Sequence, residues 1–466
     1  MKTKIGQIKK TDIFWLWLLI VVPVFGIAVV NLPPNLRLIS AIFAEKSPAG
    51  LDANYRYHFS EVLRNNPSQK EALQQEIAFY QQRLAVDAKS GLNRAALAGV
   101  YLKMGRVTGE GSWFLLAQQA ANRSIADLPF DNKGALLVLA RIAEARHDFP
   151  TALRLAKQVG FDNEDAIALA VTSHLAAGKV SEASAAAEAL VNKLPNLGSL
   201  TLRALVREAQ GRDAGVLQDY QQAMALEEPG EVAGSARVRS LLGRFYVRRG
   251  QLQQAKALFL ESLRLVPRYP LALIYLADLE VRSGNYREAE RYYSKVSAYS
   301  GGAATVFDRT VDRGMARVKE LRGDAIESRR LRDKAEAGLR QEQASGGFGH
   351  RRDLAGLLLE KGRSQDVAEA LALMQQEVKI RRDALTLDTL AWALASAGEW
   401  EKADRVMAEI LRSGIRDAGI FYRASAIARN LGKDAESRAY SQKAKEIDPS
   451  FDVRSGQALG LGNNDF

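Results

Sequence analysis

The sequence predicts an all-α solenoid behind one N-terminal transmembrane helix, and three observations lead to this prediction. Apolar and small residues recur 34 positions apart, which indicates one helical unit copied along the chain. Within each copy, apolar residues are spaced three, four and seven positions apart, as on one face of a helix. Near the N-terminus, residues 13–36 carry no charge and are mostly apolar.

Residues 13–32 are expected to form the transmembrane helix. A helix of about 20 residues spans about 30 Å, which is the hydrocarbon thickness of a bilayer. Trp15 and Trp17 lie at one end, where aromatic rings favour the membrane interface. Four lysines occur in residues 1–12, and few basic residues follow the span closely. The positive-inside rule therefore predicts a cytoplasmic N-terminal tail, with the rest of the chain on the periplasmic side of the inner membrane.

A cleaved signal peptide is the alternative explanation for this apolar segment. The apolar part of a signal peptide usually has about 7–15 residues and ends near a small-residue cleavage site. Here the apolar run is longer. The acceptable small-residue cleavage site, after Ala44, lies well beyond the end of the run at Leu32. We therefore expect a retained anchor.

Residues 33–67 are predicted to be a neck or linker, because Pro33-Pro34, Ser47-Pro48 and Gly50 interrupt any regular helix. The solenoid is expected over residues 68–453 and begins with a helix from Ser68 to Lys89.

The repeat is clearest in the middle of the chain. Gly250 is placed to form the turn between two amphipathic helices, and Pro267 closes the unit. Five residues of this unit and their counterparts 34 positions later carry the period: Leu242, Gly250, Leu252, Ala255 and Phe259, then Leu276, Gly284, Tyr286, Ala289 and Tyr293.

Two regions depart from the repeat. Residues 297–350 are degenerate, and Gly-rich stretches flank a charged helical pair there, so this region is a possible joint between two blocks. Residues 454–466 are polar and rich in Gly and Asn, so we expect a flexible tail.

The repeat resembles the tetratricopeptide repeat (TPR). Its pattern of small and aromatic residues is present as Gly243, Tyr246, Gly250, Leu252, Ala255, Phe259, Ser262 and Pro267. Residues 387–400, 421–424 and 448–452 also resemble a widespread and largely uncharacterised group of membrane-anchored bacterial repeat proteins. The resemblance implies a right-handed α-solenoid of about nine or ten helical hairpins that binds partners rather than performing chemistry.

The charge is concentrated in one part of the chain. The 65 Lys and Arg against 54 Asp and Glu give a net charge of +11. Residues 237–352 contain 24 basic and 13 acidic residues, so the whole excess lies there. No cysteine occurs, which excludes disulfides and thiolate metal sites.

The resemblance implies that the first helix of each unit lines the concave groove of the solenoid. Repeated arginines on exposed helices can simply give solubility. Alternatively, they form a cationic groove with an aromatic end, suited to an acidic peptide or an anionic polymer. The candidate groove residues are Arg237, Arg244, Arg248, Arg313, Arg317, Arg352, Trp392 and Tyr422, with Asp388 and Arg429 at further inward positions.

The sequence contains no constellation of reactive residues. Its four histidines are scattered, and it has no phosphate-binding loop, dinucleotide fingerprint or nucleophile elbow. We therefore expect no enzyme activity, no cofactor, no metal site and no small-molecule substrate. Nucleic acid would suit the charge but conflicts with the predicted compartment, so none is expected.

Two functions remain open. The leading hypothesis is an anchored extracytoplasmic scaffold that binds a protein or peptide partner, for example an acidic one, in its partly basic groove. The alternative is an accessory protein of exopolysaccharide synthesis or export. Sugar binding usually needs several stacking rings, and only Trp392 and Tyr422 are suitably placed.

Overall fold

The computed structural model describes residues 50–59, 69–299, 305–344 and 350–458. The predicted tail 1–12, the predicted span 13–32 and most of the neck lie outside these ranges. In the described ranges, no helix has both the length and the apolar character needed to cross a membrane.

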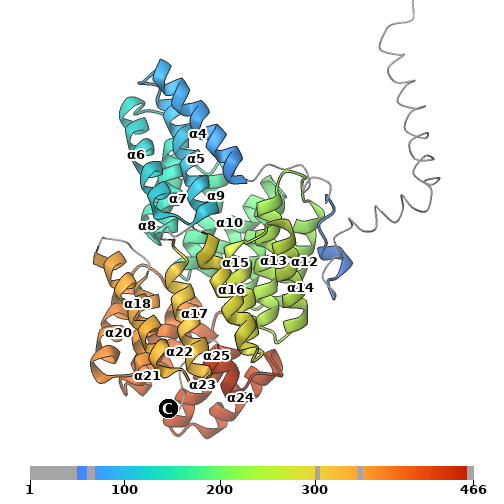
Figure 1. The fold of residues 1–466 in the computed structure, drawn as a ribbon. Helices are drawn as coiled ribbons and strands as arrows, with labels where there is room; N and C mark the ends of the chain where they lie inside the picture. The colour runs from blue at the N-terminus through green and yellow to red at the C-terminus, as the bar shows by residue number, and fades with distance from the viewer. Residues whose placement is uncertain (1–49, 60–68, 300–304, 345–349, 459–466) are drawn as a thin grey trace, which may run out of the picture. The chain divides into compact units, whose positions relative to one another are not determined.

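The described part of the chain is a stack of helical hairpins (Figure 1), and the predicted helical array is confirmed. Helix α4 (Gln69–Val86) precedes ten pairs, and α25 (Val453–Ala458) follows them. The first helices of the pairs are α5 (Gly91–Thr108), α7 (Lys133–Ala145), α9 (Glu164–Ala176), α11 (Leu197–Ala209), α13 (Val232–Val247), α15 (Pro270–Arg282), α17 (Asp308–Leu321), α19 (Arg351–Lys361), α21 (Ala384–Ser396) and α23 (Ala418–Asn430).

The second helices pack against the first. They are α6 (Gly111–Asp127), α8 (Phe149–Val159), α10 (Val180–Lys193), α12 (Asp213–Ala225), α14 (Leu252–Leu265), α16 (Tyr286–Tyr299), α18 (Ala325–Ala344), α20 (Ser364–Glu377), α22 (Trp400–Leu411) and α24 (Asp434–Ile447).

The small residues of the repeat occupy the positions that the sequence predicts. Gly250 lies between α13 and α14 with a φ of +71°, in the left-handed region that favours glycine. Ala255 is fully buried, and a Cβ on Gly243 would collide with the ring of Phe259. These close approaches explain why the motif keeps small residues at fixed positions.

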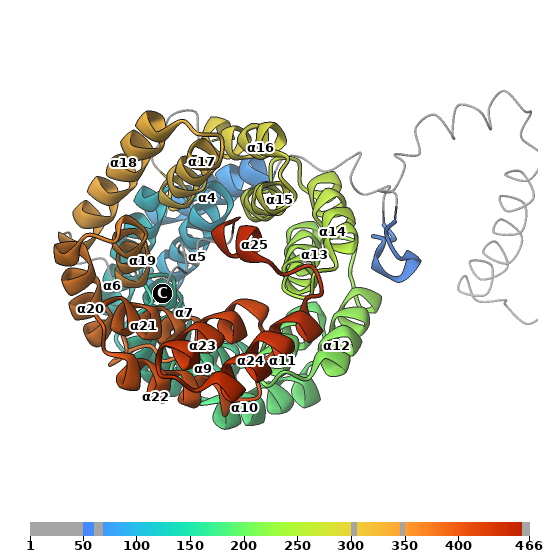
Figure 2. The ribbon, with the colours of Figure 1, turned by 90° about the horizontal axis from the view of Figure 1, so that it is seen from below.

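The pairs wind into a superhelix with two rows of helices. Figure 2 shows first helices such as α13, α15 and α21 on the inside, and second helices such as α12, α14 and α20 on the outside. The predicted placement of the first helices on the concave side is therefore seen in the structure.

Successive turns of the superhelix touch at a regular interval. The backbone N–H of Arg382 donates to the carbonyl of Ala176 at 2.7 Å, and Arg416 Nε lies 2.9 Å from Asp213 Oδ2. These partners are 206 and 203 residues apart, close to six repeats of 34. A full turn of the superhelix therefore contains about six repeats.

The region 297–350 belongs to the same stack. Helices α17 and α18 form a regular pair, and residues Pro48–Phe466 make one compact unit. One cluster of buried apolar residues ends at Val318, and the next begins at Ala335. The core thus changes between these two helices, while a functional joint stays a prediction.

Parts of the predicted tail and of the predicted neck make tertiary contacts. The predicted tail 454–466 begins inside α25, where Ser455 is buried and its backbone N–H donates to Asp452. Within the predicted neck 33–67, residues 51–59 pack against the middle of the array, and Leu51 and Tyr57 are buried. The flexible-tail prediction was therefore wrong for residues 454–458, which belong to α25, whereas the neck over residues 33–67 stays a prediction.

Gly211 provides a test of the contact between turns. Its φ is +69°, and an added Cβ would collide with the carbonyl oxygen of Gly414 on the next turn. Gly432 has the same φ of +69° but has no atom within 4 Å of an added Cβ. We expect Gly432→Ala to cost about 1–2 kcal/mol from the left-handed backbone alone. Gly211→Ala should cost about 1–3 kcal/mol more, because the backbones must separate.

Thermal unfolding followed by circular dichroism would measure both glycine variants. Equal decreases in Tm for the two variants would show that the successive turns are not in close contact at Gly211.

Candidate partner-binding site on the inner helices

The candidate groove residues all come from first helices or their ends. Arg237, Arg244 and Arg248 belong to α13 and its C-terminal end, and Arg313 and Arg317 belong to α17. The others are Arg352 on α19, Trp392 on α21 and Tyr422 on α23.

Arg244 and Arg248 are neutralised by an acidic residue of the preceding inner helix. Their guanidinium nitrogens lie 3.4 Å and 3.0 Å from the carboxylate of Glu208 on α11. Burial alone would raise the pKa of Glu208, but these two arginines and Arg249 outweigh it and lower that pKa. The carboxylate is therefore charged at neutral pH and holds both arginines.

Glu360 has the same role farther along the array. It lies on α19, 2.6 Å from Arg313 and 3.3 Å from Arg317 of α17. Burial opposes its ionisation, but the two arginines lower its pKa below the ordinary range. Arg352 in turn lies 3.9 Å from Asp383, at the start of α21. Ion pairs thus connect successive inner helices, and five of the six predicted arginines belong to them.

The predicted aromatic end is not an exposed binding surface. Trp392 is only 5% exposed, and the guanidinium of Arg423 lies 4.8 Å from its ring centroid. Arg423 is itself buried and pairs with Asp388 at 2.8 Å. Trp392 therefore does not provide an exposed aromatic end to the groove, because this side chain packs between inner helices.

Tyr422 is covered by the C-terminal end of the described chain. Its ring is half-buried, with its centroid 5.5 Å from that of Phe451. Helix α25 follows Phe451, contacts α15 and lies inside the ring of helices in Figure 2. The chain thus fills this part of its own inner face.

Arg106 and Arg237 remain as exposed inner-face cations. They come from α5 and α13, and neither has a carboxylate of a described residue within ion-pair distance. Although the Arg106 side chain is exposed, surrounding protein atoms partly desolvate its guanidinium, and this lowers its pKa. The positive charges of Arg141 and Arg237 lower this pKa further. Arg141 differs because it pairs with Glu144 and Asp165. Arg106 and Arg237 are therefore the arginines best placed for an acidic partner.

Sequence reasoning found Arg237 but missed Arg106 and the acidic partners. Arg106 is 131 residues from Arg237, which is not a multiple of the repeat, so the 34-residue period does not relate them. The sequence weakly indicated Glu208 as a partner of Arg244 and Arg248, because Glu208 lies in the last turn of the preceding first helix, α11.

The described residues offer no grouping of three or more His, Asp or Glu that could hold a metal ion. The inner face is instead a mosaic of arginines and carboxylates. Such a surface is suited to binding a polar peptide segment.

The role of Glu208 predicts a pH-dependent effect of Glu208→Gln. Because its pKa is lowered on folding, Glu208 stabilises the fold above its ordinary pKa of about 4.5, and this contribution is lost as the pH falls below that value. The variant should lose about 1–3 kcal/mol at pH 7 and less at pH 3, because this contribution decreases between the ordinary and the lowered pKa.

Urea unfolding at both pH values would measure this effect, with Glu401→Gln on the exposed surface of α22 as the control. A Glu208→Gln loss that is equal at both pH values would contradict an ionic role for this residue.

Comparisons with known proteins agree with the helical repeat. Residues 418–451, which contain α23 and α24, match the family model described as tetratricopeptide repeat. No curated protein matches the chain. Among solved structures, the chain is similar to one from "Crystal structure of APC/C hetero-tetramer Cut9-Hcn1". The identity is 12% and the TM-score is 0.36, over 86% of this chain and 98% of that one. The match to a tetratricopeptide repeat thus covers one of the ten stacked helical pairs.

Proposed function

We propose that this protein is a tetratricopeptide repeat scaffold, membrane-anchored and extracytoplasmic, that holds an acidic segment of a protein partner on its inner helices. TPR arrays serve as protein-interaction scaffolds, which supports the general role. The apolar run 13–32 and the preceding lysines support the anchor and its orientation. The proposed role is non-catalytic.

The pair of exposed arginines, Arg106 and Arg237, is the observation that carries this proposal. Burial, Arg141 and Arg237 lower the pKa of Arg106, so this guanidinium lies near other positive charge. A carboxylate placed there would relieve the repulsion and accept charge-assisted hydrogen bonds. An acidic peptide is therefore a better ligand than a neutral one.

The polysaccharide alternative receives less support. Sugar rings bind by stacking on exposed aromatic side chains. Here Trp392 is buried, and Tyr422 is partly covered by Phe451. A protein partner requires charge complementarity, which the exposed arginines supply.

The inner-face proposal predicts the behaviour of Arg106→Glu combined with Arg237→Glu. Neither side chain has an ion-pair partner among the described residues, so helicity and Tm should remain near those of the native chain. Proteins captured by the tagged native chain at moderate salt should be lost from this variant, because the acidic segment is now repelled.

The matched control is Arg154→Glu combined with Arg405→Glu. These exposed arginines lie on the second helices α8 and α22, and the net charge changes equally. Loss of the partner from the control as well would indicate nonspecific charge attraction. If the inner-face variant still captures the partner, the arginine pair is not part of the binding site.

The anchor makes a separate prediction about topology. A reporter that is active only outside the cytoplasm, fused after Phe466, should be active, and the protein should resist extraction by carbonate. A reporter active only in the cytoplasm would be the control fusion and should be silent. The reverse pattern would overturn the orientation, whereas release of a soluble form beginning near Glu45 would indicate cleavage.

A further inference from the structure

Residues 51–59 are docked on helices far along the chain. The segment contains the short 3₁₀ helix η1 (Ala53–Tyr55), which contacts α12. Its other contacts are made by α13, α14 and the connection between α12 and α13. The docked residues are separated from these partners by 172 to 204 positions, so local chain geometry does not bring them together.

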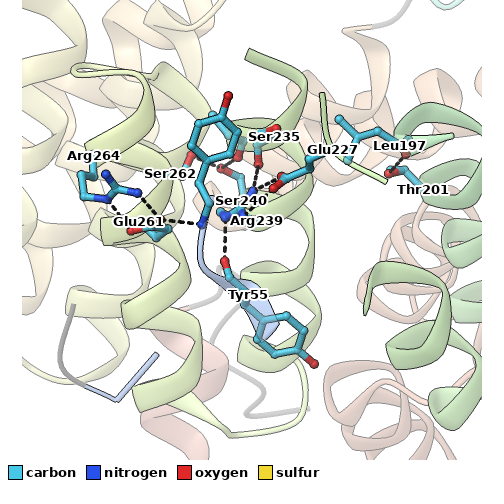
Figure 3. A network of polar contacts seen from close by, with 12 residues as sticks. Tyr55, Leu197, Thr201, Glu227, Ser235, Arg239, Ser240, Glu261, Ser262 and Arg264 are labelled. Atoms are coloured by element: carbon cyan, nitrogen blue, oxygen red, sulfur yellow. Dashed lines mark hydrogen bonds and ion pairs between the residues drawn. The ribbon is translucent and has the colours of Figure 1, made fainter. Parts of the chain in front are cut away.

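The centre of this contact is a buried arginine (Figure 3). Arg239 of α13 is completely buried, and its guanidinium forms a two-pronged pair with Glu227. Nη1 also donates to the carbonyl of Ser235 at 3.0 Å, and Nε donates to the carbonyl of Tyr55 at 2.8 Å. The docked segment therefore accepts, at the Tyr55 carbonyl oxygen, the hydrogen bond that remains available on this guanidinium.

A second carboxylate receives the backbone of the segment. The N–H of Tyr57 donates to Glu261 Oε1 of α14 at 3.2 Å, and Arg264 holds the same carboxylate at 2.6 Å. Tyr57 is only 3% exposed, and its hydroxyl donates to the carbonyl of Pro229 at 3.1 Å. Its ring packs in a buried apolar cluster with Ala236 and Leu265. The helices thus bind both the backbone and one aromatic side chain.

The segment has the alternation of an extended peptide. Tyr55, Tyr57 and Phe59 are buried or half-buried, whereas Arg56 and His58 between them are exposed. Side chains of an extended chain alternate between two faces, so one face of this segment lies on the helices. The sequence signal was therefore three aromatic residues with a period of two.

Uncovering this surface would be costly. Arg239 would lose a hydrogen bond from its fully buried guanidinium, and a pocket lined by apolar residues would be exposed. Recognition through backbone groups with a pocket for alternate side chains is the way proteins bind extended peptides. A surface with these features is a peptide site, and here its ligand belongs to the same chain.

We propose that α12, α13 and α14 form a peptide-binding site for an extended Tyr-x-Tyr-x-Phe segment, and that residues 51–59 of the same chain occupy it. This site is separate from the inner-face arginines, and it does not require the membrane anchor. A partner that carries a similar segment has to displace residues 51–59 first.

The test uses the full chain in detergent, with a specific protease site inserted between Phe59 and Gln69. After cleavage, the N-terminal fragment should still co-elute with the array. An excess of a synthetic peptide of residues 50–59 should release that fragment, and a scrambled peptide should not. Separation immediately after cleavage, or no release by the peptide, would overturn the proposal.

Tyr57→Ala and Arg56→Ala are matched variants within the segment. Tyr57→Ala removes the buried ring and should weaken retention of the fragment about tenfold or more. Arg56→Ala changes an exposed side chain and should leave retention unchanged. Because both changes lie outside the helices, circular dichroism should show an intact array. Equal retention by both variants would contradict recognition of Tyr57.

A second experiment tests whether the segment comes from its own chain. Two uncleaved copies with different tags are mixed, unfolded in urea and refolded together. Intrachain docking predicts that capture of one tag leaves the other in solution. Co-capture that is abolished by Tyr57→Ala would show that a second copy supplies the segment.

Discussion

The close contact between successive turns of the superhelix is the constraint on which the rest of the array depends. A repeat stack normally makes contacts only between neighbours, so its stability is a sum of local terms. Here an added Cβ on Gly178 would lie 2.7 Å from the carbonyl oxygen of Arg382, and Gly211 similarly abuts Gly414. Repeats about 204 residues apart are therefore coupled, and the radius of the inner face is fixed.

Ion pairs stabilise both the stack and this contact between turns. Arg244 and Arg248 are four residues apart on one helix, where like charges repel, and Glu208 offsets that repulsion. Asp213 pairs with Arg249 of a neighbouring repeat at 2.6 Å and with Arg416 of the next turn at 2.9 Å. Carboxylates outside residues 237–352 therefore pair with some of the arginines in this range. Net charge alone overstates how cationic the inner face is.

The repeat itself could be predicted from the sequence because its causes are local. Positive φ at Gly250 and close packing at Ala255 demand particular residues at fixed spacing. The site was only partly predictable, because pairing of an inner arginine depends on the opposite helix. Burial of Trp392 depends on Arg423 in the next unit, and docking of Tyr57 depends on residues more than 170 positions away. Local sequence patterns do not predict such distant contacts.

The two ends of the described chain both occupy surfaces of the array. Residues 51–59 cover the outer site at α12–α14, and α25 lies along the inner row beside α15. These intramolecular segments are present at high effective concentration, so an external ligand for either surface has to compete with them. The exposed arginines of α5 and α13 have no such competitor among the described residues. A partner can therefore meet this inner surface first without displacing a segment of the chain, whereas binding at α12–α14 requires an exchange.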